Sequence, residues 1–129
     1  MWNFDGDKLV SLARDVEKQA ATFSDDRIHA RSLLMLGSVL DDYGDRREAI
    51  RHLERAKLMV SGTLASQVHF WIASVHYEEK RLLEALDAAE EAWNLSKPRN
   101  NLVDQAQISF LVGMVLFSAD RDTEAWKYL

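Results

Sequence analysis

Large apolar residues recur at helical spacing from residue 33 to residue 56, with one interruption at Tyr43-Gly44-Asp45. Residues three and four positions apart share one face of an α-helix, so this pattern predicts two amphipathic helices joined by a tight turn. Glycine and alanine stand among the larger side chains, which favours close contact between the two helices. The positions on this face are Leu33, Leu36, Gly37, Leu40, Ala49, Leu53 and Ala56.

The same periodicity continues along the chain and predicts an all-α protein of about seven helices. The first, at residues 8–23, carries Leu9, Leu12, Ala13 and Val16 and stands alone before the first helix pair. The other helices are expected at about 27–43, 46–60, 64–79, 82–96 and 102–119, with the seventh beginning near residue 121.

Short polar segments between these stretches predict the helix ends. Gly44 can adopt the left-handed conformation that often ends a helix, and Asp45 with Glu48 has the spacing of a capping box. The turn at Lys80-Arg81 has no glycine and is the least defined of the short turns. Pro98 disfavours a helix at the preceding residue, so a loop is expected before residue 102.

The helix-pair pattern repeats. Gly37 aligns with Ala73 and Gly113 at offsets of 36 and 40 residues, and the turns GDRREA, KRLLEA and DRDTEA fall into the same register. Repetition at a fixed spacing indicates an architecture in which each unit packs on its neighbours. The turns close on the aligned pairs Glu48-Ala49, Glu84-Ala85 and Glu124-Ala125.

The repeat resembles the tetratricopeptide repeat family, whose pattern places an aromatic residue, Leu-Gly and Tyr on one helix and Ala, Phe and Ala on the next. The first copy supplies Leu33, Leu36, Gly37, Leu40, Ala49, Leu53 and Ala56. The second supplies His69, Ile72, Ala73, His76, Ala85, Ala89 and Ala92, followed by Pro98. The third supplies Ser109, Val112, Gly113, Leu116, Ala125 and Leu129. Both aromatic positions on the first helices are replaced, and the spacing exceeds the usual period of about 34 residues, as in the extended forms of the repeat.

This resemblance implies an α-solenoid with a right-handed superhelix and a single domain over residues 1–129. The expected solenoid comprises about three helix-turn-helix repeats preceded by an extra helix. The expected parts are a leading half-repeat at 5–24 and repeats at 27–61, 63–97 and 101–129, the last with a truncated second helix.

Composition narrows the partners and the compartment. The 129 residues are 47% hydrophobic and 29% charged, with a net charge of -5 in which cations and anions alternate, so neither nucleic acid nor an anionic membrane is an expected partner. The chain has no cysteine, no secretory signal and no apolar stretch of membrane-spanning length. These features favour the cytoplasm, with the nucleus as the alternative.

Three rows of side chains lie beside the packing faces of the first helices, and the resemblance places such rows on the inner groove of the solenoid. We expect Phe70 beside Phe110 and Tyr77 beside Phe117. One interpretation is a groove for a partner's helix or extended segment, with polar margins at Gln67, Gln107 and Asp41. The alternative is that these side chains only pack between repeats. The rows are Arg31, Leu34, Ser38 and Asp41, then Gln67, Phe70, Ser74 and Tyr77, then Gln107, Phe110, Met114 and Phe117.

Neither a metal site nor catalysis has a clear basis in the sequence. His69 and His76 share a helix face, but two turns separate them by about 10.5 Å, too far to bind one metal ion together. The acidic residues around Asp41 and Asp45 fit no calcium-loop spacing. Because the chain also has no Gly-rich phosphate loop and no HExxH or Gly-x-Ser-x-Gly motif, we expect no metal, no cofactor and no enzyme activity.

The leading functional hypothesis is a non-enzymatic protein-interaction scaffold that binds a peptide or helix. The first alternative is a sensor domain for a small molecule or signalling peptide, and the second is an enzyme on a helical scaffold. The third repeat stops four residues after Ala125, which leaves apolar residues at that end without a neighbour. We therefore expect this end, with Trp126 and Leu129, to contact a neighbouring domain of a longer protein or a second copy of the chain.

Overall fold

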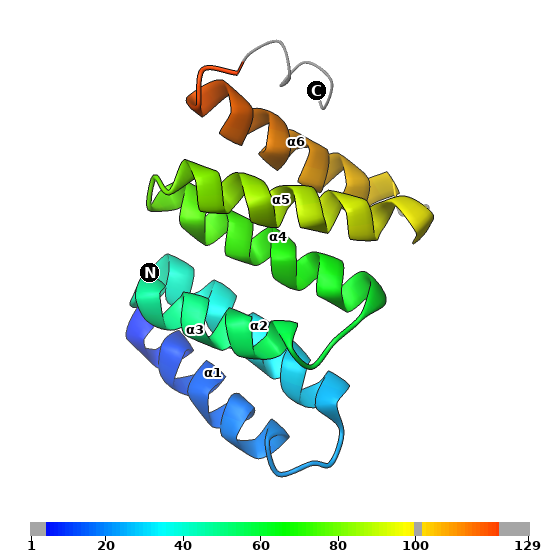
Figure 1. Ribbon diagram of the computed structural model, residues 1–129. Helices are drawn as coiled ribbons and strands as arrows, with labels where there is room; N and C mark the ends of the chain where they lie inside the picture. The colour runs from blue at the N-terminus through cyan, green and yellow to red at the C-terminus, as the bar shows by residue number, and fades with distance from the viewer. Residues whose placement is uncertain (1–4, 100–101, 122–129) are drawn as a thin grey trace. The chain divides into compact units, whose positions relative to one another are not determined.

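The computed structural model describes residues 5–99 and 102–121, and these residues form helices and turns without a strand (Figure 1). The predicted all-α class is confirmed. The expected seventh helix, together with Trp126 and Leu129, lies outside the described residues. The helices are α1 (Gly6–Ala20), α2 (Asp26–Tyr43), α3 (Arg46–Lys57), α4 (Gly62–Glu78), α5 (Leu82–Ser96), the 3₁₀ helix η1 (Lys97–Arg99) and α6 (Leu102–Ser118).

The chain divides into two compact units, Met1–Val60 and Ser61–Leu129. The first, unit 1, contains α1 to α3, and the second, unit 2, contains α4 to α6. Within each unit every helix packs on the next one along the chain, and α4 also contacts α6. Successive helices of a unit run in opposite directions, as the short turns between them require (Figure 1).

Unit 1 has a core in which a large side chain fills the space above a glycine. Ala13 of α1 packs with Leu36 and Leu40 of α2 and with Ala49 of α3. Gly37 lies against Leu53, and a Cβ atom at Gly37 would come within 2.7 Å of the Leu53 Cγ atom. The glycine therefore allows α2 and α3 to approach closely, as the sequence predicts.

Unit 2 builds its core differently. Three alanines of α5 and Ala73 of α4 bring these two helices together, and α6 covers them with larger aliphatic side chains. Phe70, Tyr77 and Phe117 pack on the edge of this core and are only partly buried. The buried aliphatic residues of α6 are Ile108, Leu111, Val112, Val115 and Leu116.

The helix boundaries repeat at the offsets found in the sequence. The helices α2, α4 and α6 begin at residues 26, 62 and 102, and α3 and α5 begin at residues 46 and 82. The aligned packing positions are buried in both complete helix pairs, except that His69 and His76, which align with Leu33 and Leu40, are only partly buried. Sequence repetition and structural repetition therefore coincide for the described residues.

The turns differ from the prediction in which residue is left-handed. Gly44 ends α2 with a φ of -142° and a ψ of -146°, so the left-handed conformation expected there is wrong. The residues aligned with it, Lys80 and Asp120, have φ values of 61° and 58°. In these two turns the next amide donates back to the helix, from Arg81 N to the His76 carbonyl at 2.9 Å and from Arg121 N to that of Leu116 at 2.8 Å. A hydrogen bond from an amide to the carbonyl five residues earlier requires a left-handed residue just before that amide. In the first turn, by contrast, the Gly44 amide donates to the carbonyl four residues earlier, that of Leu40.

At the start of α3, one of the two predicted capping residues has a different role. Asp45 caps α3 by accepting a hydrogen bond from Arg47 N at 2.8 Å, as predicted. Glu48 was expected to complete a capping box, but its carboxylate instead pairs with Arg14 of α1. A side chain that sequence spacing assigns to a local turn thus joins two helices.

Candidate binding site between α4 and α6

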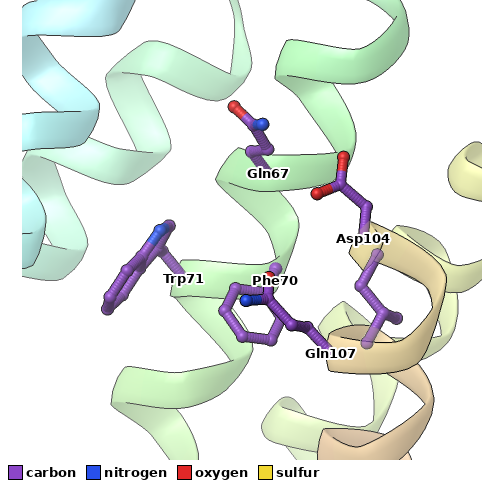
Figure 2. Close-up of a pocket in the computed structure, with 6 residues that line it drawn as sticks. Gln67, Phe70, Trp71, Asp104 and Gln107 are labelled. Atoms are coloured by element: carbon purple, nitrogen blue, oxygen red, sulfur yellow. The ribbon is translucent and has the colours of Figure 1, made fainter. Parts of the chain in front are cut away.

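A pocket of about 510 Å³ lies between α4 and α6 in unit 2. Figure 2 shows Gln107 reaching from α6 toward Phe70 of α4, with Trp71 on the other side of Phe70. The pocket combines two aromatic rings and an aliphatic side chain with two amides and one carboxylate. Its lining residues are Gln67, Phe70, Trp71, Asp104, Gln107 and Ile108.

Helical spacing explains why these residues meet. Each helix contributes positions i, i+3 and i+4, which form one continuous strip on an α-helix. Gln67 and Gln107 are also equivalent positions of the repeat, 40 residues apart. The α6 strip nevertheless lies one turn earlier in the repeat than the α4 strip, and Gln67 and Gln107 are the one equivalent pair among the lining residues.

The apolar part of the pocket rests on the core of unit 2. Ile108 is buried, and Phe70 packs on the same core cluster. The rings of Phe70 and Trp71 meet edge to face, with centroids 5.8 Å apart and planes at 79°. This geometry is favourable for aromatic pairs.

Asp104 determines the charge of the pocket. It stands in the first turn of α6, where a carboxylate offsets the positive end of the helix dipole. Neither α4 nor α6 contains a lysine or arginine. Asp104 is the one acidic residue among the six that line the pocket.

The predicted groove residues of α4 and α6 divide along the helices. Gln67, Phe70 and Gln107 line the pocket, whereas Tyr77 lies at the other end of α4, where its hydroxyl is 3.3 Å from the Ser118 hydroxyl. Phe110 is 60% exposed and does not line the pocket, so Phe70 faces Gln107 there. The remaining residues of these two rows, Ser74, Met114 and Phe117, are partly buried.

The predicted row on α2 belongs to unit 1. Arg31 is exposed, and Leu34 is partly buried. The Ser38 hydroxyl donates to the Met35 carbonyl of its own helix at 2.8 Å. The carboxylate of Asp41 is almost fully buried and accepts a hydrogen bond from Arg46 Nε at 3.2 Å. Asp41 therefore fastens the end of α2 to the start of α3.

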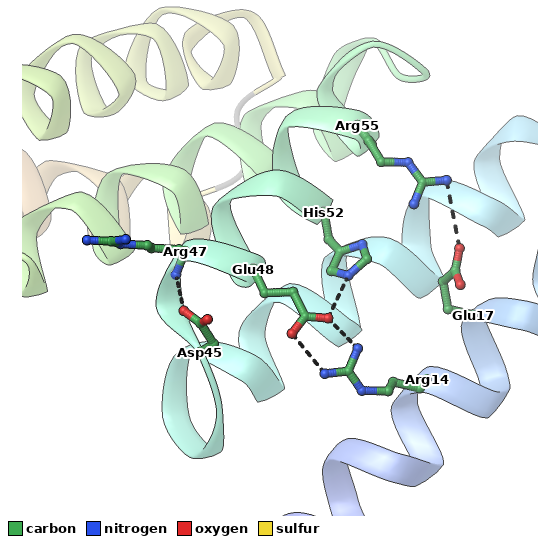
Figure 3. A network of polar contacts seen from close by, with 7 residues as sticks. All are labelled: Arg14, Glu17, Asp45, Arg47, Glu48, His52 and Arg55. Carbon is green, nitrogen blue, oxygen red and sulfur yellow. Dashed lines mark hydrogen bonds and ion pairs between the residues drawn. The ribbon is translucent and has the colours of Figure 1, made fainter.

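Unit 1 carries a separate polar network that joins α1 to α2 and α3 (Figure 3). Arg14 makes a two-bond pair with Glu48, one bond being 2.8 Å from Nη2 to Oε2, and His52 lies 3.4 Å from the same carboxylate. The Arg14 guanidinium, with a further contribution from His52, lowers the pKa of Glu48 to about 2. Glu17 lies 2.9 Å from His29 Nε2 and 4.0 Å from Arg55 Nη2. Two carboxylates thus hold the first helix on the α2–α3 pair.

No protein-family model, curated protein or solved structure matches this chain. Within residues 5–99 and 102–121 no group of three or more His, Asp or Glu side chains could hold a metal ion. In the same residues no helix is long and apolar enough to cross a membrane.

Half of the pocket lining lies outside the predicted rows. Trp71, Asp104 and Ile108 line it but were not among the candidate residues. The predicted rows followed single positions three or four residues apart, and the strip that lines the pocket is two positions wide. Extending the α6 row back by one turn from Gln107 would have reached Asp104. Trp71 and Ile108 could not be recognised in the same way, because the sequence does not distinguish an apolar residue that lines a pocket from one that only packs, and Ile108 is also part of the core.

Proposed function

We propose that this chain is a non-enzymatic protein-interaction module and that the strip between α4 and α6 binds a peptide or helix of a partner. The observation that carries the proposal is the pocket formed by Phe70, Trp71 and Ile108 with two glutamine amides at its margin. A fixed apolar pocket suits one bulky side chain of a partner. The tetratricopeptide-like register and a right-handed superhelix are part of this proposal.

The two amides favour a polypeptide over a purely apolar ligand. A glutamine side chain both donates and accepts hydrogen bonds, as a peptide group does. Gln67 and Gln107 stand on facing helices, so an extended segment between them would have a partner on each side. Further along α6, the exposed Phe110 offers a second apolar contact for a longer segment.

A random peptide library displayed on phage and selected on the full chain tests the proposal. We expect enriched peptides to bind saturably and to lose at least about tenfold in affinity with Phe70→Ala, since truncating a central aromatic contact removes on the order of 1.4 kcal/mol or more. Leu83→Ala is the matched control, because Leu83 is 76% exposed on α5 and does not line the pocket.

If Phe70→Ala lowers the helical signal in circular dichroism, weaker binding could reflect unfolding, and two further variants then test the pocket. Gln107→Ala and Phe110→Ala change exposed side chains, so the fold of unit 2 should persist in both. Weaker peptide binding in these folded variants supports the proposal. Selection without saturable binders, or binders indifferent to all three substitutions, overturns it.

The sensor alternative has one specific observation in its favour. A volume of about 510 Å³ lies within the range of small-molecule pockets, which are roughly 300 to 1,000 Å³. Nile red, a neutral apolar dye, is a suitable probe. Saturable dye binding that Phe70→Ala removes, in a chain that selects no peptide, would favour the sensor.

A further inference from the structure

We propose that the exposed face of α1 binds the same face of a second copy of this chain, with the two α1 helices antiparallel. The proposal concerns unit 1 and does not rest on the function proposed for the α4–α6 pocket. Its basis is an apolar strip along α1 that the rest of the chain leaves largely exposed, together with two charged residues beside this strip.

The apolar strip of α1 extends beyond the side that packs on unit 1. Ala13 is buried in the core of that unit, and α1 lies at one edge of it (Figure 1). Next to Ala13, Leu12 is 60% exposed and Val16 is 38% exposed, while Leu9 is partly buried. The last three residues are spaced by three and four positions, so they form one strip along the helix. Apolar side chains exposed together in this way are typical of an interaction surface.

The internal repeat indicates what such a strip packs against. Leu9 and Val16 lie 40 residues before Ala49 and Ala56 of α3. Both alanines are fully buried, and Ala49 packs on α2. The side of α3 that is buried against a neighbouring helix is therefore exposed on α1, where it carries larger apolar residues. This position in the repeat favours a helix as the partner of the strip.

The charges beside the strip favour α1 of a second copy as that helix. Lys8 and Asp15 are exposed on the same edge of the strip. In an antiparallel pair with Leu9 opposite Leu12 of the second copy, Lys8 lies within two residues, about 3 Å along the helix axis, of the level of Asp15 in the other helix. Because the arrangement is two-fold symmetric, this pair of opposite charges forms twice.

A parallel arrangement lacks these charge pairs. In a parallel helix pair, the edge that carries Lys8 and Asp15 would face the other edge of the strip, which carries the uncharged Ala13. Within residues 5–99 and 102–121, the side chains of Lys8 and Asp15 take part in no hydrogen bond or ion pair. Both charges can therefore pair across an antiparallel contact without breaking an interaction of the described residues.

The size of the contact predicts a weak dimer. Each copy contributes one helix, and the antiparallel arrangement overlaps about three turns of it. Such a contact is smaller than a standard interface, which buries roughly 800 Å² of each partner. We expect a dissociation constant on the order of 100 μM.

Sedimentation equilibrium of the full chain between about 10 μM and 1 mM tests the proposal. We expect a reversible equilibrium between monomer and dimer. Leu12→Asp should weaken the dimer at least about tenfold, because it buries a charge without a partner in the contact. Leu83→Asp is the matched control, since Leu83 is a leucine of α5 that is 76% exposed, and it should leave the dimer unchanged. Circular dichroism should show the same helical signal in both variants, because both leucines are exposed.

Charge reversal tests the antiparallel pairing. Lys8→Glu and Asp15→Lys each bring like charges together twice, so each variant alone should dimerise about fivefold more weakly at low salt. An equal mixture of the two variants should recover the dimer, because both contacts then join opposite charges. Lys18→Glu changes the net charge by the same amount as Lys8→Glu, at an exposed position of α1 away from the strip, and should dimerise like the unmodified chain.

Three results would overturn the proposal. The first is a chain that stays monomeric up to about 1 mM. The second is a dimer that Leu12→Asp does not weaken, because its interface would then lie elsewhere. The third is a mixture of Lys8→Glu and Asp15→Lys that dimerises no better than either variant alone. Peptide binding at the α4–α6 pocket is measured separately, so these results leave the proposed function unaffected.

Discussion

The two complete helix pairs, α2–α3 and α4–α5, share one repeat pattern but use different residues where their two helices are in closest contact. In the first pair Gly37 faces the large Leu53, and in the second the aligned positions are both alanines, Ala73 and Ala89. All four positions are buried. Both pairs therefore allow close approach of their two helices. In the first pair one side chain fills the contact, and in the second pair two small side chains share it.

The polar residues show a similar contrast. Glu48 binds Arg14 and contacts His52, whereas Glu84 at the aligned position is exposed. Asp45 caps α3 with its side chain, but α5 begins after Arg81 without a side-chain cap. The equivalent sequence position thus has a structural role in one pair that it lacks in the other. Substitutions at aligned positions should accordingly have unequal effects.

The largest effect is expected for Gly37→Leu. A Cβ atom alone would already lie 2.7 Å from Leu53, and a full leucine side chain cannot fit without separating α2 from α3. We expect the free energy of unfolding to fall by about 3 kcal/mol or more, at the upper end of overpacking effects. Urea denaturation followed by circular dichroism measures it. Met35→Leu, a change of similar volume at a partly exposed position of the same helix, is the control and should change stability little.

A double-mutant cycle tests whether the volume exchange between the two pairs is real. Gly37→Ala should cost about 1 to 3 kcal/mol and Leu53→Ala about 2 to 5 kcal/mol when each is made alone. The double variant has the alanine pair found at residues 73 and 89, so its added methyl group no longer meets Leu53. We expect it to be more stable than the sum of the single effects predicts, by about 1 kcal/mol. Strict additivity would show that the two positions do not share space.

The ion pair provides a comparison that depends on pH. The pKa of Glu48 is lowered from 4.5 to about 2, so its contribution to stability is present above the unfolded value and is lost as the pH falls toward 2. Because Arg14 is 41% exposed, we expect Glu48→Gln to cost only about 1 kcal/mol at pH 7. The cost should shrink between about pH 4.5 and pH 2.

Glu84→Gln is the matched control for this measurement, since Glu84 occupies the aligned position and is exposed. Its effect on stability should stay within about 0.5 kcal/mol across the same pH range. If both variants show the same pH dependence, the Arg14–Glu48 pair is not its source.

Substitutions at the N-caps of α3 and α5 should change stability in opposite directions. Asp45→Ala removes the acceptor for Arg47 N and should destabilise the chain by about 1 kcal/mol. Arg81→Asp places a capping carboxylate at the aligned position of α5 and should stabilise it by up to about 1 kcal/mol. Thermal denaturation monitored at 222 nm reports both. A loss of stability with Arg81→Asp would mean that the backbone there cannot accept a side-chain cap.

The smallest effect is expected at the turn after α4. Lys80 is held at a positive φ of 61°, where glycine has no steric cost. We expect Lys80→Gly to stabilise the chain by about 0.5 kcal/mol, because relief of strain exceeds the added flexibility of the unfolded chain. Gly44→Ala tests the other turn: Gly44 does not need a positive φ, so any loss there must come from contact of the new methyl group with Leu40.

Several features of the fold were fixed by local sequence alone. Helix positions, the turn between α2 and α3 and the 36- and 40-residue spacing followed from periodicity, since a helix buries one face whatever it packs against. The close contact at Gly37 was also predictable, because only a small residue tolerates another helix at that distance. Helical spacing also placed Gln67, Phe70 and Gln107, three of the six residues that line the pocket, in rows beside the packing faces, but only the resemblance to tetratricopeptide repeats implied that these rows line a groove.

Only the tertiary structure determined which residues form the interhelical ion pair, the left-handed turn and the pocket. Glu48 could have capped its own helix, and it binds Arg14 because α1 places a guanidinium within reach. Lys80 became left-handed because the chain must turn from α4 into α5 there, although glycine is absent. Asp104 and Trp71 joined the pocket because α6 packs beside α4, a contact between residues more than 30 positions apart. Local periodicity specifies which face of a helix is apolar, but only the packing of distant helices specifies which side chains share a pocket.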